Sequence, residues 1–235
     1  MTTTLASKRH VVADLGQAMD LCYERGWTDG LPVVPPTEAA VQRMLDAAGL
    51  AADAQLAFIT NRQVAVTAEK VAINAVMAGC LPEYMPVVVA AVEAISDPLW
   101  AYHGPATSTG GAGPLVIVNG PIARRLEINC EDNLFGPGWR ANATIGRAVR
   151  LVMRNVIGTL PGLLDRECQD GRHPDGDRRL PRRQQPPPGP PRRPALAEMQ
   201  QSRGERHSAG VMVSDGSLRS AGPGQRSARG RGARL

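Results

Sequence analysis

The feature that most constrains this chain is an abrupt change of composition after about residue 165. All eight aromatic residues of the 235-residue chain lie before residue 140. Residues 166–235 hold no aromatic residue and no lysine, but they hold 15 arginines, nine prolines and ten glycines. Ordering a residue costs roughly 1–2 kcal/mol of backbone entropy, and a segment with so few apolar side chains cannot offset that cost. We therefore expect a compact domain over residues 1–165 and a disordered tail over residues 166–235.

The charge of the chain follows the same division. Residues 1–165 carry 12 Lys and Arg against 15 Asp and Glu, whereas residues 166–235 carry 15 against seven, and the whole chain has a net charge of +5. The basic pI of about 9.4 is therefore a property of the tail. Three interpretations of the tail stay open: a basic arm for nucleic acid or an acidic partner, a solvated segment without function, and a non-native continuation read in a shifted frame from GC-rich DNA. Because the compact part is mildly acidic, we do not expect nucleic acid as its partner.

Several classes of protein are disfavoured by what the sequence lacks. There is no run of eighteen apolar residues, which argues against a membrane helix, and residues 1–8 lack the apolar core of a secretion signal. Four cysteines stand far apart without a CxxC motif, which argues against a disulfide scaffold or a Cys-rich zinc site: Cys22, Cys80, Cys130 and Cys168. His103 is the only histidine between His10 and His173, so we expect no metal site. These features favour a reduced cytoplasmic setting.

The spacing of apolar residues predicts alternating helices and strands. Helices are expected over residues 10–25, 37–48, 67–79, 82–95, 121–127 and 141–157, with Thr37 and Thr67 as N-caps. Strands are expected over residues 63–66, 99–102 and 115–118, the last of them buried on both faces because it is a continuous apolar run. Residues 103–113 are expected to form a loop rich in Gly, Ser and Thr. The predicted fold class is α/β, with a small sheet and several packed helices.

Cys80 is the first candidate for chemistry. It lies between the predicted end of one helix at Gly79 and the start of the next at Pro82. The partial positive charge at a helix N-terminus favours the thiolate, which is the nucleophilic form of cysteine. The alternative is a small apolar residue buried in a tight turn, a structural role that we also expect for Cys22 on the apolar side of its helix.

Lys70 stands out because the chain has only two lysines, the other being Lys8. A buried lysine can lose its proton and act as a base or form a Schiff base, which arginine cannot do. Lys70 and Asn74 share a helix face because they are four residues apart, and that face leads to Cys80. We therefore predict one pocket wall formed by four side chains: Glu69, Lys70, Asn74 and Cys80. A solvated Lys70 beside Glu69 is the alternative.

Three further places carry candidate residues. His103 begins its predicted loop and could serve Cys80 as a proton carrier, or simply bond to backbone groups. Arg140 and Arg147 lie near the start of the helix predicted over residues 141–157, where they suit a carboxylate or phosphate, or act only as surface arginines at a helix cap. Neither a Walker loop nor a GxGxxG motif is present, so a nucleotide is not indicated. Trp27 and Asp29 stand in a stiff proline-rich loop, which could close over a ligand or fix the N-terminal helix.

Four segments together resemble a poorly characterised bacterial protein family. They are GWTDGLPVVPPT at residues 26–37, EKVAINAVMAGC at 69–80 followed by PEY at 82–84, VNGP at 118–121 and RANATIGRA at 140–148. The family is associated with Cys- or selenocysteine-containing proteins named for a UGSC motif and is sometimes labelled thioredoxin-like. The resemblance covers roughly residues 10–165. It implies a cysteine at position 80, and its motifs add Asn119 and Asn142 to the candidate ligand-binding residues. The family continues with an ordered, aromatic-containing segment where this tail begins, which favours a shifted frame here.

Two classes of function stay open. The first is an enzyme acting on a small anionic molecule by redox or nucleophilic chemistry, as a thiol-dependent oxidoreductase, lyase or hydrolase. Its catalytic residues would be Cys80, Lys70, His103 and Glu69, and its substrate-binding residues would be Trp27, Asp29, Asn74, Asn119, Arg140, Asn142 and Arg147. The second is a non-catalytic partner subunit of a separate UGSC-type (seleno)protein. The sequence names no cofactor, and it leaves a homo-oligomer open.

Overall fold

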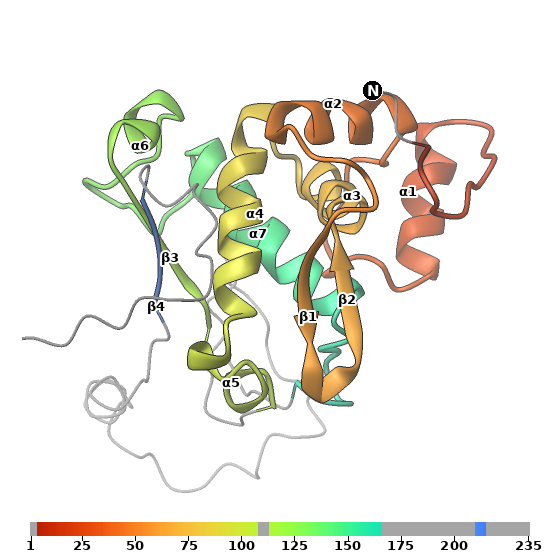
Figure 1. Cartoon of the computed structure of the whole chain (residues 1–235). Coiled ribbons are helices and arrows are strands. Elements are labelled where there is room, and N and C mark those ends of the chain that lie inside the picture. Colours follow the sequence, from red (N-terminus) through yellow and green to blue (C-terminus); the bar gives the residue numbers. More distant parts are fainter. Residues whose placement is uncertain (1–3, 108–112, 166–209, 215–235) are drawn as a thin grey trace, which may run out of the picture.

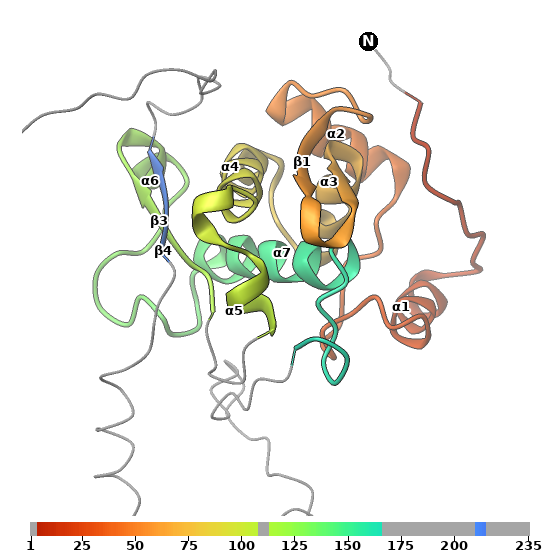
Figure 2. The same cartoon turned by 60° about the horizontal axis from the view of Figure 1, so that its bottom comes forward.

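The computed structural model describes residues 4–107, 113–165 and 210–214, the last of these as backbone only. Packed helices form its centre: α2 (Glu38–Ala48), α3 (Ala68–Ala78), α4 (Met85–Ile95) and α7 (Arg140–Asn155). A hairpin of β1 (Gln55–Ile59) and β2 (Val64–Thr67) lies on one side of α4, and β3 (Leu115–Asn119) lies on the other (Figures 1 and 2). The predicted α/β class, with a small sheet and several packed helices, is confirmed.

The strands of the described residues form two separate pairs rather than one sheet. β1 and β2 are antiparallel and are joined by the 3-10 turn η1 (Thr60–Arg62), so that Phe58 lies opposite Ala65. β3 pairs in parallel with β4 (Gly210–Ser214), and Leu115 lies opposite Gly210. The sheet content is therefore small because each pair has only two strands, and helices supply most of the core.

Helix α3 is the most deeply buried element. Every residue of α3 except Lys70 and Ile73 is buried. Its many alanines let α7 approach closely, because small side chains shorten the distance between helix axes. The buried apolar residues of the described chain form one cluster that extends from Cys22 to Ile157. Each fully buried valine or leucine in it contributes about 1.5–3 kcal/mol relative to an exposed one.

Three of the predicted signals for helix ends are found, whereas the Thr67 side chain makes no capping hydrogen bond with the described residues at the start of α3. Thr37 caps α2, since its hydroxyl accepts a hydrogen bond from the Ala40 amide at 3.3 Å. Gly49 and Gly79 end α2 and α3 in the left-handed conformation, with φ of 65° and 90°. Because side chains with a Cβ rarely adopt that conformation, glycine gives both helices a sharp stop.

The structure corrects several predicted elements. Residues 99–102 form no strand; η3 (Pro98–Trp100) is a 3-10 turn that Asp97 caps through the Leu99 amide at 2.7 Å. The helix expected from residue 82 opens as the 3-10 turn η2 (Pro82–Tyr84) before α4 begins. Residues 103–107 are the short helix α5 (His103–Thr107) rather than the start of a loop. β1 has no counterpart in the prediction, and neither does β4.

Two burial predictions also need correction. β3 is not buried on both faces, since Ile117 is 40% exposed. Helix α1 (Leu15–Glu24) begins at Leu15 rather than residue 10, capped by the Asp14 side chain through the Gln17 amide at 2.8 Å. Of the predicted apolar stripe of α1, only Cys22 is buried, as expected for a structural cysteine.

The predicted disordered tail falls almost entirely outside the described residues. The interpretations of residues 166–209 and 215–235 as a basic arm, a solvated segment or a non-native continuation therefore stay predictions. Residues 210–214 are described, and they are the strand β4 beside β3. Helix α6 (Pro121–Arg125) matches the short helix that the sequence predicts over residues 121–127.

Candidate functional site

Three of the four sequence motifs converge on one junction. The loop at residues 26–37 lies against α3 and α7, and these two helices pack along each other. The Val34 amide donates to the Met77 carbonyl of α3 at 3.2 Å. From α7, Arg154 Nη2 donates to the Gly26 carbonyl at 3.1 Å and Asn155 Nδ2 donates to the Trp27 carbonyl at 2.7 Å. We call this set of contacts between the loop, α3 and α7 the motif junction.

Asp29 and Arg147 form the strongest polar contact of the motif junction. Arg147 Nε and Nη2 donate to the two carboxylate oxygens of Asp29 at 2.9 and 2.8 Å, and Nη2 also donates to the Pro32 carbonyl at 2.9 Å. Burial pushes the pKa of Asp29 up, but the hydrogen bonds and charge of Arg147 outweigh it, so the pKa lies below its ordinary value. The predicted anion clamp is therefore occupied by the protein's own carboxylate.

Asn74 has a partner at the same junction. Its Nδ2 donates to the Lys70 carbonyl at 2.8 Å, and its Oδ1 accepts a hydrogen bond from Asn155 Nδ2 at 2.7 Å. Since Asn155 also holds the Trp27 carbonyl, a chain of amides joins α3, α7 and the loop. The Trp27 ring packs edge-on to His10, with ring centres 5.5 Å apart. The Trp27 ring therefore contacts the segment before α1, whereas Asp29 holds its loop to α7 through Arg147.

Cys80 is a buried neutral thiol. Its Sγ–H donates to the carbonyl of Thr144 on α7 at 3.3 Å. Burial raises the pKa of Cys80 to about 11, more than the Thr144 hydrogen bond and the charges of Arg140 and Arg147 lower it. A raised pKa is opposite to the lowered pKa that the sequence predicts for a thiolate at a helix N-terminus. The physical reason is that the following element η2 is a single 3-10 turn, whose small dipole does not compensate for the lost hydration of a thiolate.

Glu69 and Lys70 hold the N-terminal segment. The Glu69 carboxylate accepts hydrogen bonds from the Ala6 and Ser7 amides at 3.1 and 2.8 Å. Lys70 Nζ donates to the Ser7 hydroxyl at 3.1 Å and is exposed. Burial alone would raise the pKa of Glu69, but the bonds from Ser7 and Ala6 and the charge of Lys70 bring it below its ordinary value. Both residues therefore bind backbone and side chain of the protein itself.

The predicted pocket wall does not form as one surface. Glu69 and Lys70 are in the first turn of α3, whereas Cys80 follows its last residue. Eleven helical residues rise about 16 Å, so the two groups are separated by the length of the helix. Asn74 contacts Asn155 at the C-terminal end of α7, and Cys80 contacts Thr144 in its first turns.

His103 is not beside Cys80. Its neighbour Tyr102 shares a hydrogen bond with Thr159 Oγ1 at 2.6 Å, beyond the C-terminal end of α7. Cys80 lies near the other end of that helix, at Thr144. The predicted Cys/His pair is therefore absent from the described structure, and His103 stands on the exposed start of α5.

The remaining candidates divide between structural and exposed positions. Arg140 Nε and Nη2 donate to the Gly79 carbonyl at 3.1 and 2.9 Å, so Arg140 caps the end of α3. Asn142 holds the loop before α7: its Oδ1 accepts from the Asn129 amide at 2.9 Å, and its Nδ2 donates to the carbonyls of Asn129 and Leu134 at 2.8 and 3.3 Å. Asn119 is exposed at the end of β3.

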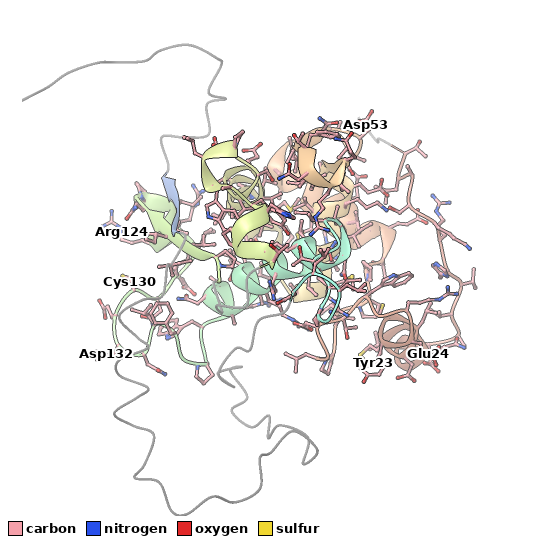
Figure 3. All side chains as sticks on the ribbon, turned by 90° about the horizontal axis from the view of Figure 1, so that it is seen from below. Tyr23, Glu24, Asp53, Arg124, Cys130 and Asp132 are labelled. Atoms are coloured by element: carbon pink, nitrogen blue, oxygen red, sulfur yellow. The ribbon has the colours of Figure 1, made fainter. Side chains whose placement is uncertain are left out.

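A second surface feature is the loop at residues 129–139, which we call the display loop. Hydrogen bonds between Asn129 and Asn142 hold the start of this loop against α7. Asn129 Nδ2 also donates to the Asp132 carbonyl, and Asn129 Oδ1 accepts from the Glu131 amide, at 3.0 Å each. Within this frame Phe135 is 81% exposed and Trp139 is 47% exposed. Figure 3 shows Cys130 and Asp132 of this loop on the opposite side of the molecule from Tyr23 and Glu24 of α1.

Sequence reasoning missed a cavity of about 370 Å³ at the tip of the β1–β2 hairpin. Its walls come from the hairpin turn and from the segment between α4 and α5, and they include Phe58, Arg62, Asp97, Tyr102 and His103. Only His103 among them was a candidate. Arg62 carries no local sequence signal, because its position depends on a hairpin whose first strand the sequence did not reveal.

No group of three or more His, Cys, Asp and Glu residues in the described part of the chain is close enough to hold a metal ion. Within the same residues, no helix combines the length and the apolar character that crossing a bilayer requires.

Comparison with known proteins adds no identity. No family model matches the chain, and neither a curated protein nor a solved structure is significantly similar to it. The resemblance to the family associated with UGSC-motif proteins therefore stays a prediction based on the four sequence motifs.

Proposed function

We propose that this chain is a non-catalytic subunit that binds a separate protein through the display loop. The observation that carries the proposal is the combination of a fixed loop backbone and an aromatic ring that it presents to solvent: Asn142 clips the loop, and Phe135 is 81% exposed. Aromatic side chains on well-ordered backbone are typical anchors of protein interfaces.

The physical advantage of the display loop is preorganisation. Association has to offset the entropy lost when interface groups become ordered. Here the loop backbone is already ordered before any partner binds. The Asn129–Asn142 contacts hold it, and the Gly136 amide donates to the Asn133 carbonyl at 2.7 Å. Gly136 also leaves room for the Asn133 side chain, whose atoms would lie 2.1–2.2 Å from a Cβ at that position. A partner therefore gains the burial of Phe135 without ordering the loop.

The state of the candidate catalytic residues favours this proposal over a thiol enzyme. Cys80 is buried with a raised pKa, and Arg147 is paired with Asp29. A nucleophilic cysteine needs a thiolate and access to substrate, and an anion clamp needs a free guanidinium. In this arrangement the same residues contribute to stability. For the identity of the partner, the sequence motifs support a UGSC-type (seleno)protein.

The proposal is tested by measuring the affinity of the full chain for a UGSC-type protein by isothermal titration calorimetry. Wild type is expected to bind, and Phe135→Ala is expected to weaken binding by about tenfold or more, as for the truncation of an interface anchor. The matched control is Tyr23→Ala, an aromatic residue that is 67% exposed on α1 and lies on the opposite side of the molecule. Tyr23→Ala should leave the affinity unchanged.

Two outcomes would contradict the proposal. An absence of binding by the wild-type chain would remove the UGSC-type partner. Equal affinities for wild type and Phe135→Ala would remove the display loop from the interface. Sedimentation of the chain alone separates a third case, because a self-association that Phe135→Ala abolishes would make the loop a homo-oligomer contact instead.

A further inference from the structure

The cavity at the tip of the β1–β2 hairpin has walls that the protein itself holds in place. Gln63 Nε2 donates to the Thr60 carbonyl at 2.7 Å within the hairpin turn. On the other wall, the Asp97 side chain caps η3 through the Leu99 amide at 2.7 Å. Gln63, next to the turn, and Ala101, in the lining, have φ of 54° and 51°, a conformation that persists in such residues only where the surroundings fix it. A ligand therefore finds the cavity already ordered.

Three exposed residues of the lining keep hydrogen-bonding capacity that the protein does not use. Asp97 engages Oδ1 in its cap, whereas its Oδ2 has no hydrogen-bond partner within the described residues. The Asn61 amide and the His103 ring make no hydrogen bond to the described residues either. A carboxylate oxygen only accepts, whereas an amide and a neutral imidazole both donate and accept. Because a hydroxyl group also does both, neighbouring hydroxyls on one ligand can bond to all three side chains.

An aromatic ring belongs to the same lining. Phe58 is 45% exposed, so its ring is open to a ligand. The face of an aromatic ring is electron-rich and attracts C–H groups, such as those on the flat side of a sugar ring. Tyr102 adds apolar surface only, because its hydroxyl is already bonded to Thr159. The lining thus pairs an apolar face with polar groups, as a ring that carries hydroxyls at its edge requires.

The charges of the lining favour a neutral ligand. Asp97 is its only acidic residue and Arg62 its only arginine or lysine, so their formal charges cancel. Arg62 contributes as a charge alone, since its Nε and Nη2 are buried and do not face the cavity. An anion would be repelled by Asp97 and a cation by Arg62, whereas a neutral molecule meets neither cost.

We propose that this cavity binds a neutral sugar in its pyranose form. Phe58 packs on the C–H face of the sugar, Asp97 accepts hydrogen bonds from its hydroxyls, and Asn61 and His103 bond to the hydroxyls that remain. The volume of about 370 Å³ falls in the range of about 300–1,000 Å³ that small-molecule sites occupy. The site is separate from the display loop and does not depend on it.

The proposal is tested by NMR titration of the full-length chain with the methyl glycosides of glucose, galactose and mannose. At least one glycoside is expected to bind at a single site in the millimolar range, which is usual for so small a polar ligand. Cyclohexanol, a ring of the same size with one hydroxyl, and tetramethylammonium, a cation that suits an aromatic ring beside a carboxylate, should each bind at least about tenfold more weakly.

Two substitutions with matched controls assign the binding to this cavity. Asp97→Asn should weaken the glycoside by about tenfold or more, because an amide oxygen is a weaker acceptor than a carboxylate. Asp53→Asn makes the same charge change at an exposed residue before the start of β1, at the other end of the hairpin, and should leave binding unchanged. Phe58→Leu should weaken binding by about threefold or more, whereas Phe58→Tyr keeps a flat ring and should bind like wild type.

Folding of the variants is checked by thermal unfolding without ligand. Asp97→Asn keeps a side-chain oxygen for the Leu99 amide, so its Tm should change little, and the Phe58 pair decides the question if Asp97→Asn unfolds. The proposal is overturned if no glycoside binds to wild type, or if cyclohexanol or tetramethylammonium binds as tightly. It is also overturned if folded Asp97→Asn or Phe58→Leu binds like wild type, or if Asp53→Asn or Phe58→Tyr weakens binding as much as its counterpart.

Discussion

Cys80 shows how the surroundings of a side chain decide its chemistry. The sequence leaves two interpretations of Cys80 open: a thiolate at a helix start, or a small residue buried in a turn. The hydrogen bond from the Cys80 thiol to the Thr144 carbonyl favours the second. A pKa of about 11 leaves about one thiol in ten thousand ionised at pH 7, some hundred-fold fewer than at an ordinary cysteine. The thiol is therefore neutral over the whole physiological range.

Alkylation by iodoacetamide measures this directly. At pH 7, peptide mapping should show Cys80 reacting at least about a hundred times more slowly than the exposed Cys130, because both its pKa and its burial oppose reaction. The rate at Cys80 should keep rising with pH toward about 11. Rapid modification of Cys80 at neutral pH, levelling off below about pH 8.5, would instead support the thiol-enzyme hypothesis.

Asp29 provides a second prediction at the residue scale. Asp29→Asn should lower the free energy of unfolding by about 1–3 kcal/mol, since it removes the charge that pairs with the partly buried Arg147. Asp53→Asn, at an exposed aspartate, is the control and should have little effect. Urea denaturation monitored by circular dichroism gives both values.

The difference in the free energy of unfolding between wild type and Asp29→Asn should depend on pH with a definite sign. The pKa of Asp29 is lower in the folded protein than in the unfolded chain, where it is about 3.9. The ion pair therefore stabilises the fold fully above about pH 4, and its contribution disappears as pH falls through the folded pKa. The gap between wild type and Asp29→Asn should be constant from about pH 5 to 7 and should narrow below about pH 4. A gap that widens in acid would contradict the assignment.

At the scale of elements, the longer helices and the strands β2 and β3 could be predicted, whereas β1, β4 and the short helix α5 could not. The helices α2, α3 and α7 carry apolar residues at helical spacing, and α2 and α3 end at the glycines Gly49 and Gly79, so these features follow from local chemistry. β1 is identified only by its antiparallel pairing with β2, and β4 only by its pairing with β3, which is distant in sequence. The sequence predicts a strand over residues 99–102, but Pro98 and the Asp97 cap favour the 3-10 turn η3.

The motif junction was predictable as a set of residues but not as a function. The sequence marks Asp29, Asn74, Arg140 and Arg147 as candidates by their places in a loop or on a helix, and the resemblance adds Asn142. The structure shows each of them in a hydrogen bond to another part of the protein. Spacing along a helix shows which residues share a face. It cannot show whether a carboxylate or an amide elsewhere in the chain already occupies that face.

Asn142 is the residue through which α7 controls the display loop. Asn142→Ala should release residues 129–139 and lower the free energy of unfolding by about 1–3 kcal/mol, because it removes three hydrogen bonds that are partly buried. Chemical denaturation together with the rate of cleavage by chymotrypsin at Phe135 reports both effects. Asn119→Ala, at the exposed end of β3, should change neither quantity. Unchanged cleavage in Asn142→Ala would show that the clip does not order the loop.

At the scale of the whole molecule, structural and binding features occupy different places. The motif junction lies between the loop at residues 26–37, α3 and α7, whereas the display loop precedes α7 and the cavity is at the hairpin tip. One buried cluster from Cys22 to Ile157 includes residues of the loop at 26–37 and of the hairpin. The chain therefore has an interior in which most of its candidate residues are bonded to other parts of the protein, and the display loop and the hairpin-tip cavity lie elsewhere.

The most direct test of this account is hydrogen–deuterium exchange of the full chain with and without a UGSC-type protein. We predict that the partner slows exchange of backbone amides within residues 129–139 and leaves α1 unchanged, since α1 is on the opposite side of the molecule. Slower exchange confined to the turn around Cys80 and the start of α4, with the display loop unaffected, would contradict the proposal and return Cys80 to the centre of the function.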